Sequence, residues 1–171
     1  SFPLPRRSRS PHRQYYRVLA RLACRAERII VPSGAVASDV LRYLRYSPEQ
    51  IRVVPEAPRA GLTAASPGAV ASLCASLGVE PGYALCVGTA EPGKRAVDAV
   101  RAIAALRDAG RAMQLVLAGN PGPLSEALRA EAARLRVADR CHFVGYIRDD
   151  DLAALYSGAL ALVFPSLHEG V

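Results

Sequence analysis

Residues 83–166 alternate between short apolar segments and longer amphipathic segments, and this alternation constrains the fold more than any other feature of the chain. The apolar segments predict four strands: YALCVG, AMQLVLAG, RCHFVG and LALVFPS. The segments between them have the apolar spacing of helices: KRAVDAVRAIAALRDAG, LSEALRAEAARLRV and DDDLAALYSGA. Continuously apolar strands between such helices are typical of a parallel sheet that is covered on both faces. The sequence therefore predicts an α/β fold.

Small or turn-forming residues follow each predicted strand. Gly88, Gly119 and Gly145 close the first three strands, and Pro165-Ser166 closes the fourth. In parallel α/β sheets, ligands bind beyond the carboxyl ends of the strands. We therefore expect the loops at these four ends to form a ligand cleft.

The first of these loops, in CVGTAEPGKRAVDAV, is close to a phosphate-binding P-loop but departs from it at two places. Arg95 stands where a P-loop has the Ser or Thr that holds magnesium, and Pro92 removes a backbone N–H from the loop. A P-loop nucleotide triphosphatase is therefore not expected. Lys94, the single lysine of the chain, is predicted at the first turn of a helix, where it favours an anionic ligand such as phosphate.

Residues 1–60 form a separate region. They contain predicted helices over residues 14–28 and 35–44 and predicted strands at RIIVPS and IRVVPEAP, and residues 57–69 are rich in Ala, Gly and Pro, as in a linker. Twelve Arg against four acidic residues give residues 1–60 a net charge of +8, whereas the rest of the chain has −1. This charge fits an anionic membrane surface, an anionic substrate or simply a solvated face. No aromatic-studded basic strand accompanies it, so nucleic acid is not an expected partner.

Other site types find little support in the sequence. The four cysteines and three histidines are dispersed, and none of the cysteines forms a CxxC pair, so we expect reduced packing cysteines and no metal centre. No run of about 18 apolar residues predicts a membrane-spanning helix. The start lacks an apolar stretch of the kind found in signal peptides, and both ends are expected to be cut from a longer chain.

Several stretches taken together, in this order, resemble glycosyltransferase family 4, the retaining group with the two-domain GT-B architecture. They are CRAERIIVPSGAVASDVLRYL, IRVVPEAP, VGTAEPGKRAVDAVRAIAAL, LVLAGNPG and FVGYIRDDDLAALYSGALALVFPSLHEG, and they cover about residues 14–171. The resemblance implies a Rossmann-like parallel sheet flanked by helices. It assigns residues 1–60 to the end of an acceptor domain, 61–76 to the linker and the start of the donor domain, and 77–171 to a truncated domain that binds a nucleotide sugar.

The resemblance also implies roles for single residues. Lys94 matches the lysine that contacts the donor diphosphate, and Glu169 matches the first of two family glutamates, near the donor sugar. The second glutamate would lie beyond Val171. These two residues are the expected catalytic groups. The expected donor-binding residues are Gly88, Thr89, Lys94, Arg95, Gly119, Tyr146, Ile147, Arg148, Glu169 and Gly170, of which Tyr146, Ile147 and Arg148 would orient the nucleobase.

The implied activity is transfer of a hexose from a nucleoside-diphosphate sugar, with retention of configuration, to a glycan, lipid-linked or small-molecule acceptor. No cofactor or metal is expected, and the resemblance places the protein in polysaccharide or glycolipid biosynthesis in the cytoplasm, with the inner membrane face as an alternative. Two other functions stay open. One is a truncated, non-catalytic remnant that binds nucleotide sugars, and the other is a GT-B epimerase that acts on the nucleotide sugar itself.

Overall fold

The computed structural model describes residues 19, 22, 25–58, 62–167 and 169. Contacts within the chain divide it into two compact units, Ser1–Pro58 with Gly170–Val171, and Arg59–Glu169. Within the described residues, no helix combines the length and the apolar character needed to cross a bilayer.

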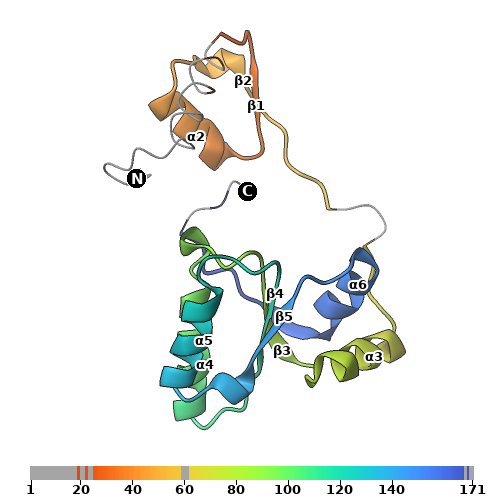
Figure 1. The fold of residues 1–171 in the computed structure, drawn as a ribbon. Coiled ribbons are helices and arrows are strands. Elements are labelled where there is room, and N and C mark those ends of the chain that lie inside the picture. The colour runs from red at the N-terminus through yellow and green to blue at the C-terminus, as the bar shows by residue number, and fades with distance from the viewer. Residues whose placement is uncertain (1–18, 20–21, 23–24, 59–61, 168, 170–171) are drawn as a thin grey trace. The chain divides into compact units, whose positions relative to one another are not determined.

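The second unit is built on a four-stranded parallel sheet (Figure 1). Its strands lie in the spatial order β5–β4–β3–β6, and all neighbouring pairs are parallel. Their bounds are Tyr83–Val87 for β3, Leu115–Ala118 for β4, Cys141–Gly145 for β5 and Ala159–Leu162 for β6. The chain therefore builds the sheet outward from β3 to β5 and then returns to the other side of β3. The α/β fold with a parallel sheet is confirmed.

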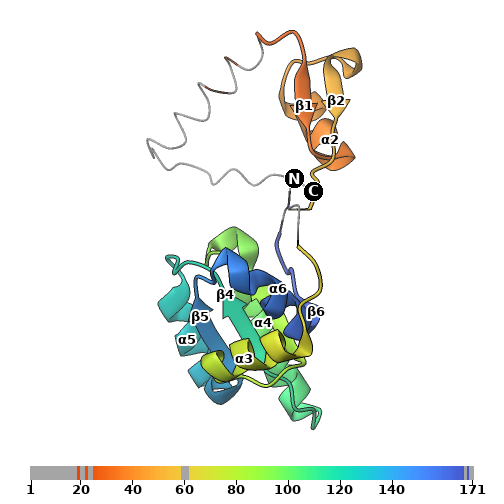
Figure 2. The same cartoon turned by 90° about the vertical axis from the view of Figure 1, so that its right-hand side faces the viewer.

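Helices cover both faces of this sheet (Figures 1 and 2). The helices α4 (Ala96–Asp108) and α5 (Ser125–Arg134) lie on one face, and α3 (Pro67–Leu77) and α6 (Asp149–Gly158) lie on the other. Short 3-10 turns, η2 (Pro92–Lys94) and η3 (Ala138–Arg140), precede α4 and β5. Each strand sends alternate side chains to opposite faces, so the domain has two apolar layers.

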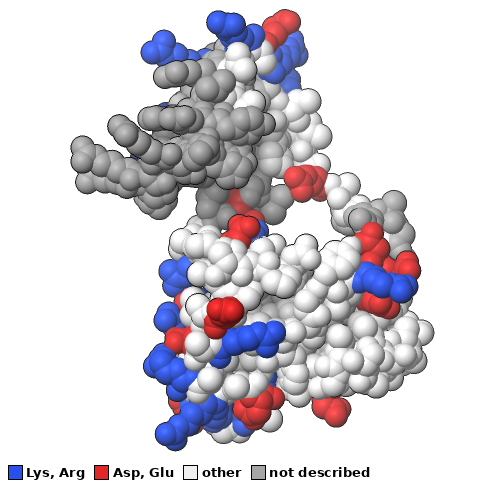
Figure 3. All heavy atoms as spheres, in the orientation of Figure 1, with Lys and Arg blue, Asp and Glu red and all other residues white. Residues whose placement is uncertain are grey.

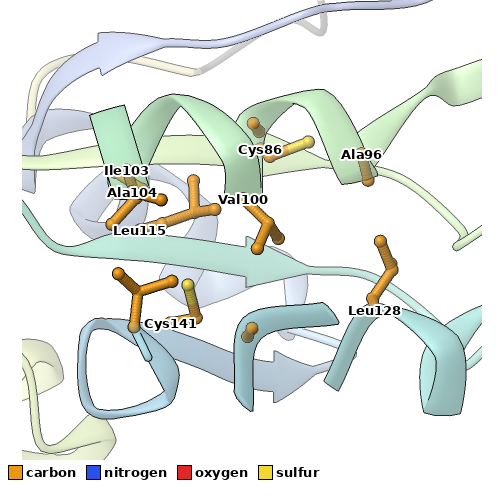
Figure 4. Close-up of a cluster of buried hydrophobic side chains, with 11 residues drawn as sticks. Cys86, Ala96, Val100, Ile103, Ala104, Leu115, Leu128 and Cys141 are labelled. Atoms are coloured by element: carbon orange, nitrogen blue, oxygen red, sulfur yellow. The ribbon is translucent and has the colours of Figure 1, made fainter. Parts of the chain in front are cut away.

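The layer under α4 and α5 is the larger of the two buried clusters in this unit. Val100 and Ile103 of α4 and Leu128 of α5 pack on Leu115 and Cys141 of the sheet (Figure 4). On the opposite face, Tyr83, Leu85 and Val116 of the sheet pack against Cys74 of α3 and Leu155 of α6. The buried Tyr83 hydroxyl donates a hydrogen bond of 2.7 Å to the Leu155 carbonyl oxygen, which fixes α6 against the sheet. Cys74, Cys86 and Cys141 are buried and unpaired, as expected for packing cysteines, and Cys24 lies outside the described residues.

The strand β6 is less covered than the other strands of the predicted sheet. Leu160 and Leu162 are 69% and 49% exposed. β6 lies at the edge of the sheet, so one of its sides has no neighbouring strand in the described chain.

Between residues 25 and 58, the first unit contains two parallel strands with a helix between them: β1 (Ile29–Val31), α2 (Gly34–Tyr43) and β2 (Ile51–Val53), with the 3-10 turn η1 (Pro48–Gln50) before β2. Ser33 caps α2 by accepting a hydrogen bond from the Val36 N–H, as Ser commonly does at a helix start. Val31, Val40, Tyr46 and Ile51 form its small core.

Part of the predicted first region cannot be compared with the structure. The helix predicted over residues 14–28 falls mostly outside the described residues. Residues 19 and 22 are helical as predicted, whereas residues 25–28 form a turn and an irregular segment. Seven of the twelve arginines of residues 1–60 also fall outside the described residues. In the second unit, basic and acidic side chains are interspersed on the side of α4 and α5 (Figure 3).

Hydrogen bonds of the Glu131 side chain join α5 to α4. From them we predict a measurable dependence of stability on pH. Its carboxylate bonds to Arg134, 2.7 Å away, and to Arg101 of α4, 3.0 Å away, and these two contacts lower the pKa of Glu131 to about 2. A carboxyl with a lowered pKa in the folded state stabilises the fold fully above its unfolded pKa of about 4.3, and this contribution is lost as the pH falls toward the folded value.

We therefore expect the urea midpoint of the wild type to fall more than that of Glu131→Gln between about pH 6 and about pH 3. Circular dichroism at a series of pH values measures it. Glu126→Gln, the same change at an exposed position of the same helix, is the matched control. Equal pH dependence of the two variants would show that the Glu131 pairs do not contribute to folding.

Candidate functional site

Three glycines shape the carboxyl edge of the sheet where β3, β4 and β5 end. Gly88, Gly119 and Gly145 all have positive φ, at 136°, 145° and 72°. A Cβ at Gly119 would collide with the Gly88 carbonyl oxygen, and the Gly119 N–H donates to the Gly145 carbonyl oxygen at 2.8 Å. Only glycine allows this close approach of two backbones together with such a φ. The three glycines expected to end strands do so, and they line one pocket.

The pocket has a volume of about 210 Å³ and lies at this edge, on the side of α4 and α5. Its floor is a row of three side chains in register across the sheet: Cys86 of β3 opposite Leu117 of β4, and Leu117 opposite Phe143 of β5. Pro165 and Ser166, which follow β6, do not belong to its lining. The cleft predicted from four loops is therefore formed by three of them.

Lys94 lines the pocket, but it does not lie in the first turn of an α-helix as predicted. It ends the 3-10 turn η2, and its N–H donates to the Glu91 carbonyl oxygen at 3.1 Å. Arg95 follows with φ 52°, a left-handed conformation that interrupts the helical path, so α4 begins only at Ala96. The prediction was wrong because the helical spacing of the apolar residues does not reveal a left-handed residue in front of them.

Lys94 and Glu169 form an ion pair, with Nζ 2.8 Å from Oε1. The pair is partly accessible, because the side chains are 39% and 32% exposed. The Leu167 N–H donates to the Gly93 carbonyl oxygen at 2.9 Å, and this bond holds the segment after β6 beside the turn that carries Lys94. Two residues that are 75 positions apart in the chain are thereby brought together.

The position of this pair in the sheet has a topological cause. Lys94 follows β3 and Glu169 follows β6, and these two strands are neighbours at the point where the strand order reverses. The loops on the two sides of such a switch point diverge to opposite faces, which leaves a crevice where α/β proteins bind ligands. Both expected catalytic residues therefore lie at the place where the topology favours a ligand.

The pKa of Cys86, on the pocket floor, responds to burial and to a nearby charge. Burial raises the pKa of the Cys86 thiol, and the nearby charge of Lys94 partly opposes this shift. The thiol therefore stays neutral near pH 7 and contributes apolar surface. Lys94 and Arg129 are the charged residues of the pocket lining, and no Asp or Glu of the described chain lines it. The pocket lining therefore carries positive charge, which Glu169 partly offsets at Lys94.

The other residues expected at the site lie in different places. Thr89 lines the pocket. Arg95 does not, and its Nε binds Asp98 at 2.6 Å. Gly170 lies outside the described residues.

Tyr146, Ile147 and Arg148 follow β5 but do not line the pocket. Tyr146 is 64% exposed, and Ile147 packs against the cluster under α3 and α6. The guanidinium of Arg148 lies 3.2 Å from the Asp150 carboxylate, at the start of α6. Their expected role toward a nucleobase stays a prediction.

The charged residue Arg129 and its ring partner Phe143 were not anticipated from the sequence as pocket residues. Arg129 of α5 lines the pocket, and its Cζ lies 4.2 Å from the ring centroid of Phe143. Nothing in the sequence distinguishes Arg129 from the other arginines of the chain. One indirect signal exists for its place at the pocket. Helical side chains lean toward the N-terminus of their helix, and the N-terminus of α5 follows the end of β4.

No group of three or more His, Cys, Asp or Glu side chains that could hold a metal ion occurs in the described part of the chain.

Comparison with known proteins identifies related chains. A family model described as "Glycosyl transferases group 1" matches residues 76–171. The MMP alpha-(1->4)-mannosyltransferase of Mycolicibacterium hassiacum is 31% identical over 152 residues, which are 88% of this chain and 34% of that protein. The O-antigen chain mannosyltransferase B of Escherichia coli is 27% identical over 85% of this chain and 39% of its own length. The chain thus spans less than half of the length of these relatives.

Solved structures share the fold. HepE of Anabaena, crystallised with UDP and glucose, superposes with a TM-score of 0.78 at 21% identity, over 94% of this chain and 45% of that chain. The sucrose-phosphate synthase of Thermosynechococcus elongatus superposes with a TM-score of 0.77 at 26% identity, over all of this chain and 41% of that chain. These structures are GT-B glycosyltransferases, so the GT-B type of the fold is confirmed.

Proposed function

The chain belongs to the glycosyl transferases of group 1, and on this premise we propose that it is the donor-binding part of a family 4 enzyme that transfers a hexose from a nucleoside-diphosphate sugar with retention of configuration. The observation that carries the proposal is the Lys94–Glu169 pair at the switch point between β3 and β6. A cation and a carboxylate at one crevice match the two ends of the reacting bond, the departing diphosphate and the sugar.

The chemistry of the proposed reaction fits these two groups. Cleavage of the donor places negative charge on the leaving diphosphate, and a cation held in advance at that position lowers the barrier. The sugar becomes cationic in the same transition state, and a nearby carboxylate stabilises it. Lys94 would serve the first need and Glu169 the second. In this proposal no metal ion takes part, because the lysine supplies the charge.

The domain assignment belongs to the same proposal. Residues 77–171 would bind the donor, residues 61–76 would connect and begin that domain, and residues 1–60 would be the end of an acceptor domain. HepE was crystallised with UDP, which supports a nucleotide partner for the second unit. The acceptor, a cytoplasmic location and an association of the basic region with anionic membrane stay predictions.

The alternatives have less support. The curated relatives that match are transferases, which does not favour an epimerase acting on the donor. A non-catalytic remnant and a transferase domain share the ability to bind nucleotide, so transfer itself separates them.

Calorimetry of the 171-residue chain tests the proposal. We expect UDP, GDP or ADP to bind, and the affinity of the tightest of them to be the same in buffer with magnesium and in buffer with EDTA. Loss of binding in EDTA would contradict the lysine-based site and favour a metal-dependent one. Absence of binding to all three nucleotides in both buffers would contradict donor binding by this domain.

Retention is tested separately, by the anomeric configuration of the transfer product in a chain extended to the length of its relatives.

A further inference from the structure

Arg129 is a positioned cation that no step of the proposed function uses. It lines the same pocket as Lys94 but comes from a different element, because Arg129 belongs to α5 and Lys94 to the turn η2 before α4. In the part of the chain that the structure describes, Arg129 has no carboxylate partner, and its guanidinium lies over the ring of Phe143. Its charge is therefore not neutralised within the described chain.

The stack on Phe143 determines what Arg129 can bind. The guanidinium carbon of Arg129 lies over the Phe143 ring, 4.2 Å from its centroid, so the ring contacts one side of the group. Its five N–H groups point outward in the plane of the group, so its edge remains available for a planar pair of oxygens. Two parallel hydrogen bonds to a phosphate are the interaction that this geometry favours. The aromatic support also reduces the conformational freedom that Arg129 would lose on binding.

The order of the strands places Arg129 relative to the other groups. Along the carboxyl edge of the sheet, Glu169 follows β6 and Lys94 follows β3, whereas Phe143, which supports Arg129, belongs to β5 at the far side. If the proposed function is correct, the donor sugar lies at Glu169 and the adjacent phosphate at Lys94. The remainder of the donor then extends toward β5, and the next charged group along it is the phosphate that carries the nucleoside.

We propose that Arg129, stacked on Phe143, binds the nucleoside-proximal phosphate of the donor, while Lys94 binds the phosphate attached to the sugar. This inference rests on the proposed function and assigns a second cation to its donor site. With two cations, each contacting a different phosphate, the nucleoside diphosphate is held at both phosphates before the sugar bond breaks. The pocket lining of small residues, such as Ala96 and the three glycines, leaves room for this group between them.

The test compares three probes: the nucleoside diphosphate, the monophosphate and the nucleoside of whichever base the chain binds best. Calorimetry of the full 171-residue chain measures their affinities. Arg129→Gln is expected to weaken the diphosphate and the monophosphate by about tenfold or more, as for loss of a hydrogen-bonded charge, and to leave the nucleoside unchanged. Arg129→Lys keeps the charge without the planar edge and should fall between wild type and Arg129→Gln.

Two comparisons make the result specific. Arg134→Gln removes the same charge from the same helix at a residue that pairs with Glu131 and does not line the pocket, so it should leave all three affinities unchanged. Lys94→Ala should weaken the diphosphate much more than the monophosphate, in contrast to Arg129→Gln. Far-ultraviolet circular dichroism and the thermal midpoint confirm that each variant is folded, which is expected because Arg129 is exposed.

The failure of this inference can be told apart from the failure of the proposed function. A wild type that binds none of the nucleotides contradicts the proposed function, and the inference with it. A wild type that binds the diphosphate while Arg129→Gln binds it equally well contradicts the inference alone. Equal weakening of all three probes by Arg129→Gln would also overturn it, because Arg129 would then act on the nucleoside or on the shape of the pocket.

Discussion

Replacing Lys94 with alanine is expected to lower kcat of sugar transfer by about 100-fold or more and to raise KM for the donor. Lys94 lines the pocket and also pairs with Glu169 across the switch point, so it would contact the diphosphate both before and during departure. Its contact with the ground state accounts for the change in KM. The diphosphate gains charge as the bond to the sugar breaks, so the interaction strengthens in the transition state and the loss also appears in kcat.

Arg95→Ala is the matched comparison for Lys94→Ala. It removes the neighbouring cation, which binds Asp98 and does not line the pocket, and we expect a much smaller effect on both constants. The transfer assay requires the chain extended to the length of its relatives, and calorimetry of the nucleoside diphosphate can use the 171-residue chain. If Arg95→Ala weakens nucleotide binding as strongly as Lys94→Ala does, the assignment of the phosphate contact to Lys94 alone, and not to Arg95, is wrong.

Much of the second unit could be predicted from the sequence because local rules agree with one another there. Apolar runs such as YALCVG become parallel strands, and the glycines after them take the positive φ values that let the strand ends approach each other. The prediction of a ligand pocket at this edge depended on the same rules, since parallel strands end together. The side-by-side placement of Cys86, Leu117 and Phe143 could not be predicted, because it depends on the register between strands, which a single sequence does not contain.

The details of the candidate site depended on contacts that are distant in the chain. The pairing of Lys94 with Glu169 follows from the position of β6 beside β3, and the alternation of strands and helices leaves the order of strands open. The left-handed Arg95 was missed because arginine rarely adopts that conformation and nothing in its neighbours signals it. The proposed role of Arg129 could be inferred only once the position of the Phe143 ring, on another element, was known. Packing and topology, and not residue type, decide these features.

Glu169 and Lys94 should be separable by experiment, although they contact each other. The Glu169 carboxylate lies 2.8 Å from the Lys94 ammonium, so in the absence of ligand it occupies a position where an anionic phosphate would bind. A diphosphate must compete with this carboxylate for Lys94 or bind beside it. Removing the negative charge of Glu169 therefore removes a competitor and a source of repulsion, and nucleotide affinity should not fall.

We expect Glu169→Gln to leave the affinity for nucleoside diphosphate unchanged or modestly higher, while transfer falls by about 100-fold. The loss of transfer follows because the neutral amide cannot stabilise positive charge that develops on the sugar. Calorimetry with the free nucleoside diphosphate and a transfer assay measure the two effects. Glu169→Asp is the control, since it keeps the charge on a shorter side chain and should retain more transfer than Glu169→Gln. If Glu169→Gln weakens nucleotide binding as much as Lys94→Ala does, Glu169 contributes to the phosphate site and not to the sugar, and the assignment of the two residues to the two ends of the reacting bond is wrong.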